Sequence, residues 1–172
     1  RGGFGGPNGG LAGRINFSLY HTWHFKEQVT IRDNLPVLDL LNGAATGSRG
    51  GQPRHEIEAQ GGVSKDGLGF RLNTKWQSAT TVFTGVAGTD RLNFDSTTTV
   101  GLRLFADMGQ QISLVRKHRW LRGTRITLSV DNLFDSHPRV TDKLGTVPIS
   151  YQPDLLDPQG RVVRLSLRKL FF

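Results

Sequence analysis

The chain of 172 residues carries 22 Lys and Arg against 14 Asp and Glu, a formal charge of +8, and only 36% of its residues are apolar. It has no cysteine, which excludes disulfides and thiolate metal sites, and no run approaches the roughly 18 apolar residues of a membrane helix. A soluble core of this size needs more Leu, Ile and Val, whereas a membrane barrel needs only an apolar outer band. The charge favours an anionic partner, either nucleic acid or a membrane surface.

Residues 1–13 contain too much glycine to hold a regular element. We expect a flexible turn or linker there, and a single RGG is not the repeat array of a nucleic-acid segment. A first strand follows, in which apolar side chains on one face alternate with polar ones on the other. Its apolar face consists of Ile15, Phe17, Leu19, Trp23 and Phe25, with His21 interrupting it.

The next predicted elements are a long irregular loop over 27–53 and a hairpin. Residues 54–64 and 68–83 alternate as two strands around Lys65-Asp66-Gly67, and Asp-Gly is a favoured hairpin turn. A shorter polar loop over 84–95 and a fourth strand over 96–106 come next. Long loops are expected on the extracellular side of an outer-membrane barrel, and short turns on the periplasmic side.

The connection over 107–123 is long for a periplasmic turn and can hold a short helix or a strand extension. Its basic side chains could bind nucleic acid or anionic lipid: Arg116, Lys117, His118, Arg119 and Arg122. We prefer the simpler interpretation of a solvated turn at the inner interface, with Trp120 in an aromatic girdle. A fifth strand over 124–133 and a Pro-, Asp- and Gly-rich loop over 134–159 follow.

The chain ends in a two-sided strand over 160–172. Arg164, Ser166 and Arg168 alternate with the apolar face, which consists of Val163, Leu165, Leu167 and Phe171. Lys169 shares that apolar face. We expect it near the end of a membrane span, where its head group can extend into water.

Six strands are too few for a closed barrel, since single-chain bacterial barrels have an even number and at least 8. An open sheet would expose two edges, which lipid does not tolerate. The sequence therefore predicts an all-β fold that forms the C-terminal part of a larger antiparallel transmembrane barrel. Residues 1–13 and the C-terminus would lie on the periplasmic side, and the loops over 27–53, 84–95 and 134–159 on the other.

The tail resembles the C-terminal hallmark of TonB-dependent outer-membrane receptors. The matching pieces are Asp131-Asn132-Leu133-Phe134-Asp135, Val147-Pro148 with Tyr151, Asp157-Pro158, Gly160-Arg161 and the aromatic terminus. The 17–23 and 51–56 stretches are similar to a subgroup of these receptors. The doubled ending is a departure, because the family usually stops at one in-phase aromatic, here Phe171, and Phe172 lies one residue beyond it.

The resemblance implies that residues 14–172 are the last six strands of a 22-stranded barrel in the outer membrane of a Gram-negative bacterium. It implies energised uptake of a scarce nutrient such as a ferric siderophore. It also implies contact with outer-membrane lipid and with the barrel assembly machinery, which would read Phe171 and Phe172. The N-terminal plug and the TonB-binding segment of the family are not in this sequence, so the TonB complex would act only through that missing part.

The candidate site residues are six basic side chains that would point into the barrel lumen: Arg71, Lys75, Arg103, Arg125, Arg164 and Arg168. We expect them to pair with acidic residues of a plug, or else to guide an anionic ligand. The loops over 27–53 and 134–159 are the best candidates for contact with the nutrient. The individual ligand-binding residues are not predicted.

The remaining motifs do not indicate an enzyme, a cofactor or a metal. The five histidines have no ligand spacing, and the Asp and Asn residues of 131–135 are expected to cap a turn. Two alternatives stay open. One is a subunit that contributes strands to a passive oligomeric barrel. The other is a soluble basic Gly/Arg protein that binds nucleic acid, which is disfavoured because the aromatic residues lie opposite the basic ones.

Overall fold

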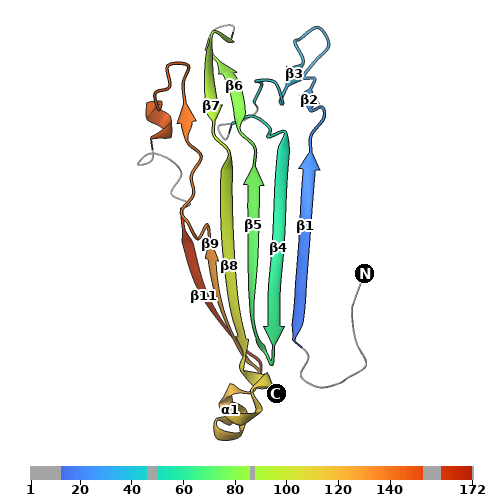
Figure 1. Cartoon of the computed structure of the whole chain (residues 1–172), viewed down its shortest axis with the longest axis vertical. Helices are drawn as coiled ribbons and strands as arrows, with labels where there is room; N and C mark the ends of the chain where they lie inside the picture. The colour runs from blue at the N-terminus through green and yellow to red at the C-terminus, as the bar shows by residue number, and fades with distance from the viewer. Residues whose placement is uncertain (1–12, 46–49, 86–87, 153–159, 172) are drawn as a thin grey trace.

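The computed structural model describes residues 13–45, 50–85, 88–152 and 160–171. These residues form an all-β structure dominated by one antiparallel sheet of six long strands (Figure 1). Each strand pairs with the next along the chain. The sheet order is β1 (Arg14–Trp23), β4 (His55–Lys65), β5 (Leu68–Gln77), β8 (Thr97–Asp107), β9 (Thr124–Asp131) and β11 (Val162–Lys169).

The six predicted long strands are thus confirmed. The predicted tight turn between β4 and β5 is confirmed too, because Asp66 and Gly67 have φ angles of 50° and 79°. Two consecutive residues with positive φ give the hairpin turn whose twist matches the strands. A side chain at Gly67 would also collide with the backbone carbonyl of Asp107, 2.7 Å from the Cβ position.

The strand register places the alternating side chains on common faces. One transverse row runs through all six strands and carries Phe17, Gly61, Leu72, Leu102, Val130 and Val163. The row beside it points to the other face and carries Asn16, Gly62, Arg71, Arg103, Ser129 and Arg164. We call the side of the sheet with the first row the apolar face and the side with the second row the polar face.

The described residues leave most of the apolar face exposed, and Val130, at 9% exposed, is its one buried apolar side chain among them. Phe17 and Leu165 are both 74% exposed on the two outer strands, and Leu104 in the centre is still 41% exposed. Only four apolar side chains of the described residues are buried, and three of these lie outside the long sheet. Among the described residues the sheet is a single layer with a largely exposed apolar surface, and its two outer strands, β1 and β11, pair on one side only.

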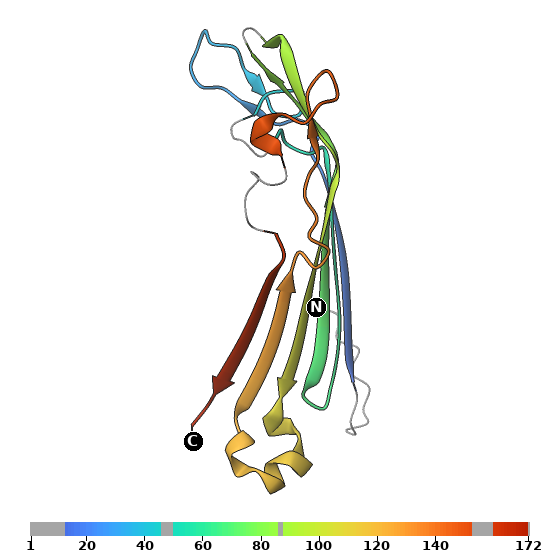
Figure 2. The ribbon, with the colours of Figure 1, turned by 90° about the vertical axis from the view of Figure 1, so that its left-hand side faces the viewer.

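The three long connections at one end of the sheet pack together into a structure that we call the loop head (Figure 2). It contains a β2–β3 pair, a three-stranded sheet and a short helix: β2 (Gln28–Val29), β3 (Leu38–Asp39), β6 (Thr80–Thr84), β7 (Asp90–Phe94), β10 (Val140–Thr141) and η4 (Ile149–Tyr151). Its core is formed by Val82, Phe94 and Val140, against which Tyr151 packs. The backbone N–H of Phe83 donates to the Gly43 carbonyl at 2.8 Å and so ties the first loop to the second.

Some boundaries predicted from the sequence are wrong, and the loops predicted over 27–53 and 134–159 contain β2, β3, β10 and η4. The third long strand ends at Gln77 rather than at residue 83, and residues 84–95 contain β7 rather than only a loop. The alternation does continue past Gln77. However, β6 is not part of the long sheet. It pairs with β7, so the alternating residues after Gln77 belong to a different sheet.

The opposite end of the sheet has the tight β4–β5 turn and a helical connection between β8 and β9. The connection contains η2 (Met108–Gln110), α1 (Ile112–Lys117) and η3 (Arg119–Leu121). Of the two predicted forms, the short helix is correct. The described part of the chain holds no helix with the length and apolar character of a membrane span.

Candidate functional site on the polar face

The polar face brings like charges together at mid-sheet. Arg71 on β5 lies directly opposite Arg103 on β8, and the same transverse row ends at Arg164 on β11. Like charges directly opposite each other on one face destabilise a sheet. Alternation along the two strands places both guanidinium groups on the same side of the sheet.

A second pair of like charges lies nearer the turn end. Arg125 on β9 is directly opposite Arg168 on β11. The guanidinium carbon of Arg125 also lies 4.8 Å from the centre of the Phe105 ring, a cation–π contact. Phe105 is an aromatic residue on the polar face that the sequence analysis did not single out. Gly69, directly opposite, leaves room for its ring.

Only two of the six predicted basic residues have an acidic partner among the described residues. Arg164 binds Asp131 with 2.6 Å between Nη1 and Oδ2. Lys75 lies 2.8 Å from Glu56 and 3.5 Å from Glu58. Within the described ranges no carboxylate pairs with Arg71, Arg103, Arg125 or Arg168, and Arg103 instead donates to the Ser129 hydroxyl at 3.3 Å. The polar face therefore carries an excess of positive charge in its middle and toward the end with the β4–β5 turn.

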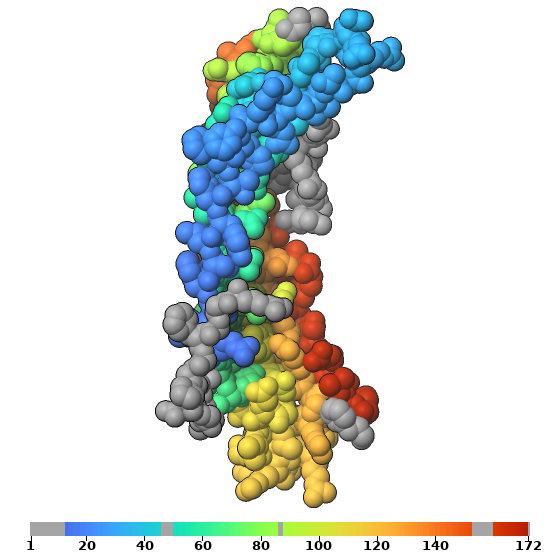
Figure 3. Space-filling model, turned by 90° about the vertical axis from the view of Figure 1, so that its right-hand side faces the viewer, coloured from blue at the N-terminus to red at the C-terminus, as the bar shows by residue number. Residues whose placement is uncertain are grey.

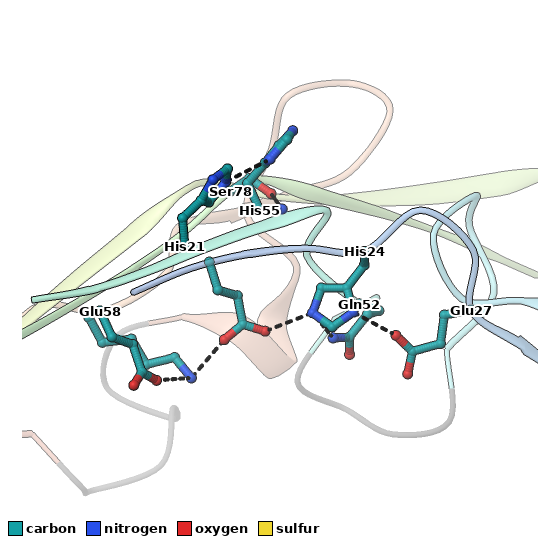
Figure 4. A network of polar contacts seen from close by, with 9 residues as sticks. His21, His24, Glu27, Gln52, His55, Glu58 and Ser78 are labelled. Carbon is teal, nitrogen blue, oxygen red and sulfur yellow. Dashed lines mark hydrogen bonds and ion pairs between the residues drawn. The ribbon is translucent and has the colours of Figure 1, made fainter. Parts of the chain in front are cut away.

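Near the loop head the polar face has a connected cluster that sequence reasoning missed (Figure 4). His24 Nδ1 lies 3.2 Å from Glu27, and its Nε2 lies 3.6 Å from Glu56 and 3.3 Å from the Gln52 amide. Glu56 continues the cluster to Lys75. The alternation of polar residues at the end of β1 and the start of β4 was the available signal. It did not reveal that the two strand ends are paired neighbours.

The histidines are less dispersed than their spacing suggests. His21 Nε2 lies 3.3 Å from His55 Nδ1, and the two rings stack with centroids 5.4 Å apart. His21 and His24 point to opposite sides of β1, as predicted (Figure 4). Within the described residues no group of three His, Cys, Asp or Glu side chains is arranged to hold a metal ion.

The turn that follows β9 caps the strand, as its Asp and Asn residues predict. Asn132 and Asp135 have φ angles of 51° and 56°. The side-chain oxygen Oδ1 of Asn132 accepts a hydrogen bond from the Ser136 N–H at 2.8 Å. Oδ1 of Asp135 accepts one from the Arg161 N–H at 2.8 Å. The second contact links the start of the last loop to the residue just before β11.

The predicted terminal signal falls partly within the described structure. Phe171 is 88% exposed and continues the phase of the apolar face, while Phe172 lies outside the described residues, as do residues 1–12 of the predicted linker. The predicted ligand loops over 27–53 and 134–159 belong to the loop head, except for residues 46–49 and 153–159, which are also outside the described residues.

No family model, no curated protein and no solved structure matches this chain.

Proposed function

We propose that residues 14–171 form part of the wall of an outer-membrane β-barrel, namely the last six strands of a TonB-dependent receptor that takes up a scarce nutrient such as a ferric siderophore. The observation that carries this proposal is the largely exposed apolar face that extends across all six strands. A face of this extent on a single-layer sheet needs an apolar medium, since exposed patches beyond a few hundred Å² mark an interaction surface.

The dimensions of the sheet fit a bilayer. A strand of 10 residues such as β1 is roughly 33 Å long at about 3.3 Å per residue. A tilt of about 40° reduces its height to roughly 25 Å, the height of the apolar band of such barrels. The tight β4–β5 turn opposite the loop head fits as well, whereas the helical β8–β9 connection at the same end is longer than the turns expected there.

The charge of the polar face supports our proposal that this face points into the barrel lumen. Arg71, Arg103, Arg125 and Arg168 lack carboxylate partners in the described structure, so an anionic group from elsewhere would stabilise them. Acidic side chains of a plug inside the barrel are the partners that we propose. An anionic nutrient passing along the same wall is the alternative use of these arginines.

The experiment begins with the native polypeptide that contains this sequence. Its intact mass and upstream coding region should show several hundred further residues that include a plug. Cells producing that polypeptide should then accumulate labelled ferric siderophore, and an uncoupler of the proton-motive force should abolish the accumulation. Uptake that persists without energy would overturn the transporter proposal.

The open edges of the sheet favour one second candidate. Strands β1 and β11 could pair with further copies of the same chain and so close a passive oligomeric barrel. This candidate predicts a native polypeptide that begins near Arg1 and a ring of several copies in detergent. Diffusion through that barrel would not respond to the uncoupler.

A further inference from the structure

The helical connection over 108–123 is strongly basic and carries no acidic residue. Arg116, Lys117, Arg119 and Arg122 are all exposed. No carboxylate among the described residues forms an ion pair with Arg116, Lys117 or Arg119. Arg116, Lys117 and Arg119 are therefore solvent-facing cations that no carboxylate of the described residues neutralises.

The last strand holds the connection against the lower edge of the apolar face. The Lys169 amine donates to the backbone carbonyls of Trp120 and Arg122. The Leu170 N–H donates to the Gly123 carbonyl at 2.9 Å. Lys169 is in phase with the apolar residues of β11, so these bonds fix η3 beside the end of that face. Figure 3 shows the connection (yellow) at the base of the molecule, below the end of β11 (red).

Apolar side chains accompany the cations. Trp120 is 67% exposed, and Ile112 and Leu114 are exposed on the same short connection. Phe171 lies beside it, with its ring centre 5.9 Å from the Lys169 amine. Aromatic residues at the edge of an apolar band, next to cations on flexible stems, are the side chains that suit a boundary between acyl chains and head groups.

We infer that the 108–123 connection binds the head-group phosphates of anionic phospholipids in the leaflet at the turn end of the sheet. Arg116, Lys117 and Arg119 supply the charge, while Trp120 and Phe171 sit at the level where head groups meet acyl chains. This inference rests on the proposed function, because the apolar face must lie in a bilayer for η3 to reach its surface. It gives a role to a basic segment that the sequence alone suggested was a solvated turn.

The test compares the full native polypeptide in phosphatidylcholine vesicles with and without phosphatidylglycerol. We expect phosphatidylglycerol to raise the folding equilibrium constant, measured by urea titration. In the triple variant Arg116→Gln/Lys117→Gln/Arg119→Gln, that gain should fall by about fivefold for each charge removed, since a cation near an anionic surface contributes about 1 kcal/mol. The gain in the wild-type protein should shrink as salt is added.

Two control variants separate the site from general effects. Arg32→Gln/Arg91→Gln/Lys143→Gln removes three exposed cations from the loop head and should keep the gain from phosphatidylglycerol. Arg116→Lys/Arg119→Lys keeps the charge and should also keep the gain, which shows that the gain depends on charge. The titration of the glutamine variant in phosphatidylcholine alone shows whether that variant folds.

Several outcomes would overturn the inference. An equal gain in the glutamine variant and the wild-type protein would remove the lipid site and leave the membrane placement intact. The same gain from inorganic phosphate at matched ionic strength would assign the cations to free phosphate, and preferential binding of a DNA duplex through them would assign a nucleic-acid surface. Failure of the native polypeptide to enter phosphatidylcholine vesicles would instead contradict the proposed function itself.

Discussion

Gly69 shows how a single residue shapes the polar face. A Cβ atom at this position would lie 2.4 Å from the tip of the Phe105 ring and 2.8 Å from the Val63 carbonyl oxygen. The missing side chain lets the ring lie across β5, where Arg125 stacks over it. Gly69 on β5 therefore makes room for the cation–π contact between Phe105 on β8 and Arg125 on β9.

We expect Gly69→Ala to displace Phe105 and to destabilise the sheet by about 1 to 3 kcal/mol, the usual cost of overpacking. Gly61→Ala is the matched control on β4, because its Cβ would meet nothing closer than 3.7 Å. Urea titrations of both variants in vesicles measure the difference. Similar midpoints for the two variants would show that Phe105 has no fixed place on Gly69.

Leu165 and Ser166 are adjacent residues of β11 that face opposite sides of the sheet. Leu165→Arg puts a charge on the exposed apolar face and should cost about 2 to 4 kcal/mol at the middle of a membrane. Ser166→Arg adds the same charge to the polar face and should cost little. Refolding titrations in vesicles compare the two, and equal effects would show that the face assignment is wrong.

Among the elements, the loop head has a core of its own, separate from the long sheet. Phe94 is 6% exposed and meets the Tyr151 ring edge-on at 5.5 Å between centroids. Phe94→Ala should therefore loosen all three connections together, because truncation of a buried Phe costs about 3 to 5 kcal/mol in a packed core. Faster proteolysis in the loops, with unchanged insertion of the strands, is the expected result.

Phe134→Ala is the matched control for this prediction. Phe134 belongs to the last loop but is 70% exposed, so its truncation should leave the proteolysis rate of the loops nearly unchanged. A loss of membrane insertion in Phe94→Ala alone would contradict the separation of the loop head from the sheet.

A turn in the last loop should respond to pH. Asp142 accepts the N–H groups of Leu144 at 2.8 Å and Thr146 at 2.9 Å, and the Thr146 hydroxyl at 2.5 Å. These hydrogen bonds, with that of the Thr146 hydroxyl first, hold the pKa of Asp142 below its ordinary value. The ionised form is favoured in the folded turn, so the stabilisation is complete above the ordinary pKa of about 4 and is lost as pH falls through the lowered pKa.

Amide hydrogen exchange at Leu144 and Thr146 measures this effect. Protection relative to the unfolded chain should decrease over that acidic range in the wild-type protein and should be small and nearly constant in Asp142→Asn. Identical pH profiles for the two proteins would exclude the carboxylate as the cause.

The long strands were predictable because alternation is a local property, and it locates β1, β4, β5, β8, β9 and β11 to within a few residues. The sequence also placed Arg71 and Arg103 on one face. It did not show that they are direct neighbours, because register depends on pairing between distant segments. The same limit explains the misplaced end of the third strand, since β6 keeps the alternation of β5 but pairs with β7. The His24 cluster was missed for the same reason.

For the molecule as a whole, the unpaired edges of β1 and β11 decide what the chain can do alone. In lipid an open edge leaves backbone groups without partners, which is costly. A polypeptide limited to residues 13–171 should therefore give no folded monomer in vesicles, whereas the full native polypeptide should. Migration in gel electrophoresis before and after heating distinguishes the two, and a compact heat-sensitive monomer of the short polypeptide would contradict the open-edge argument.

The pairing of each long strand with the next along the chain also limits how the sheet can change during evolution. Two consecutive strands with their turn form a unit that a gene can duplicate or lose without disturbing the pairing of the others. Loss of one strand alone would invert the direction of every later strand and move each later loop to the opposite end of the sheet. Such a sheet can therefore widen or narrow during evolution in steps of two strands, and recombination between related genes can exchange a loop of the head while the wall below it is retained.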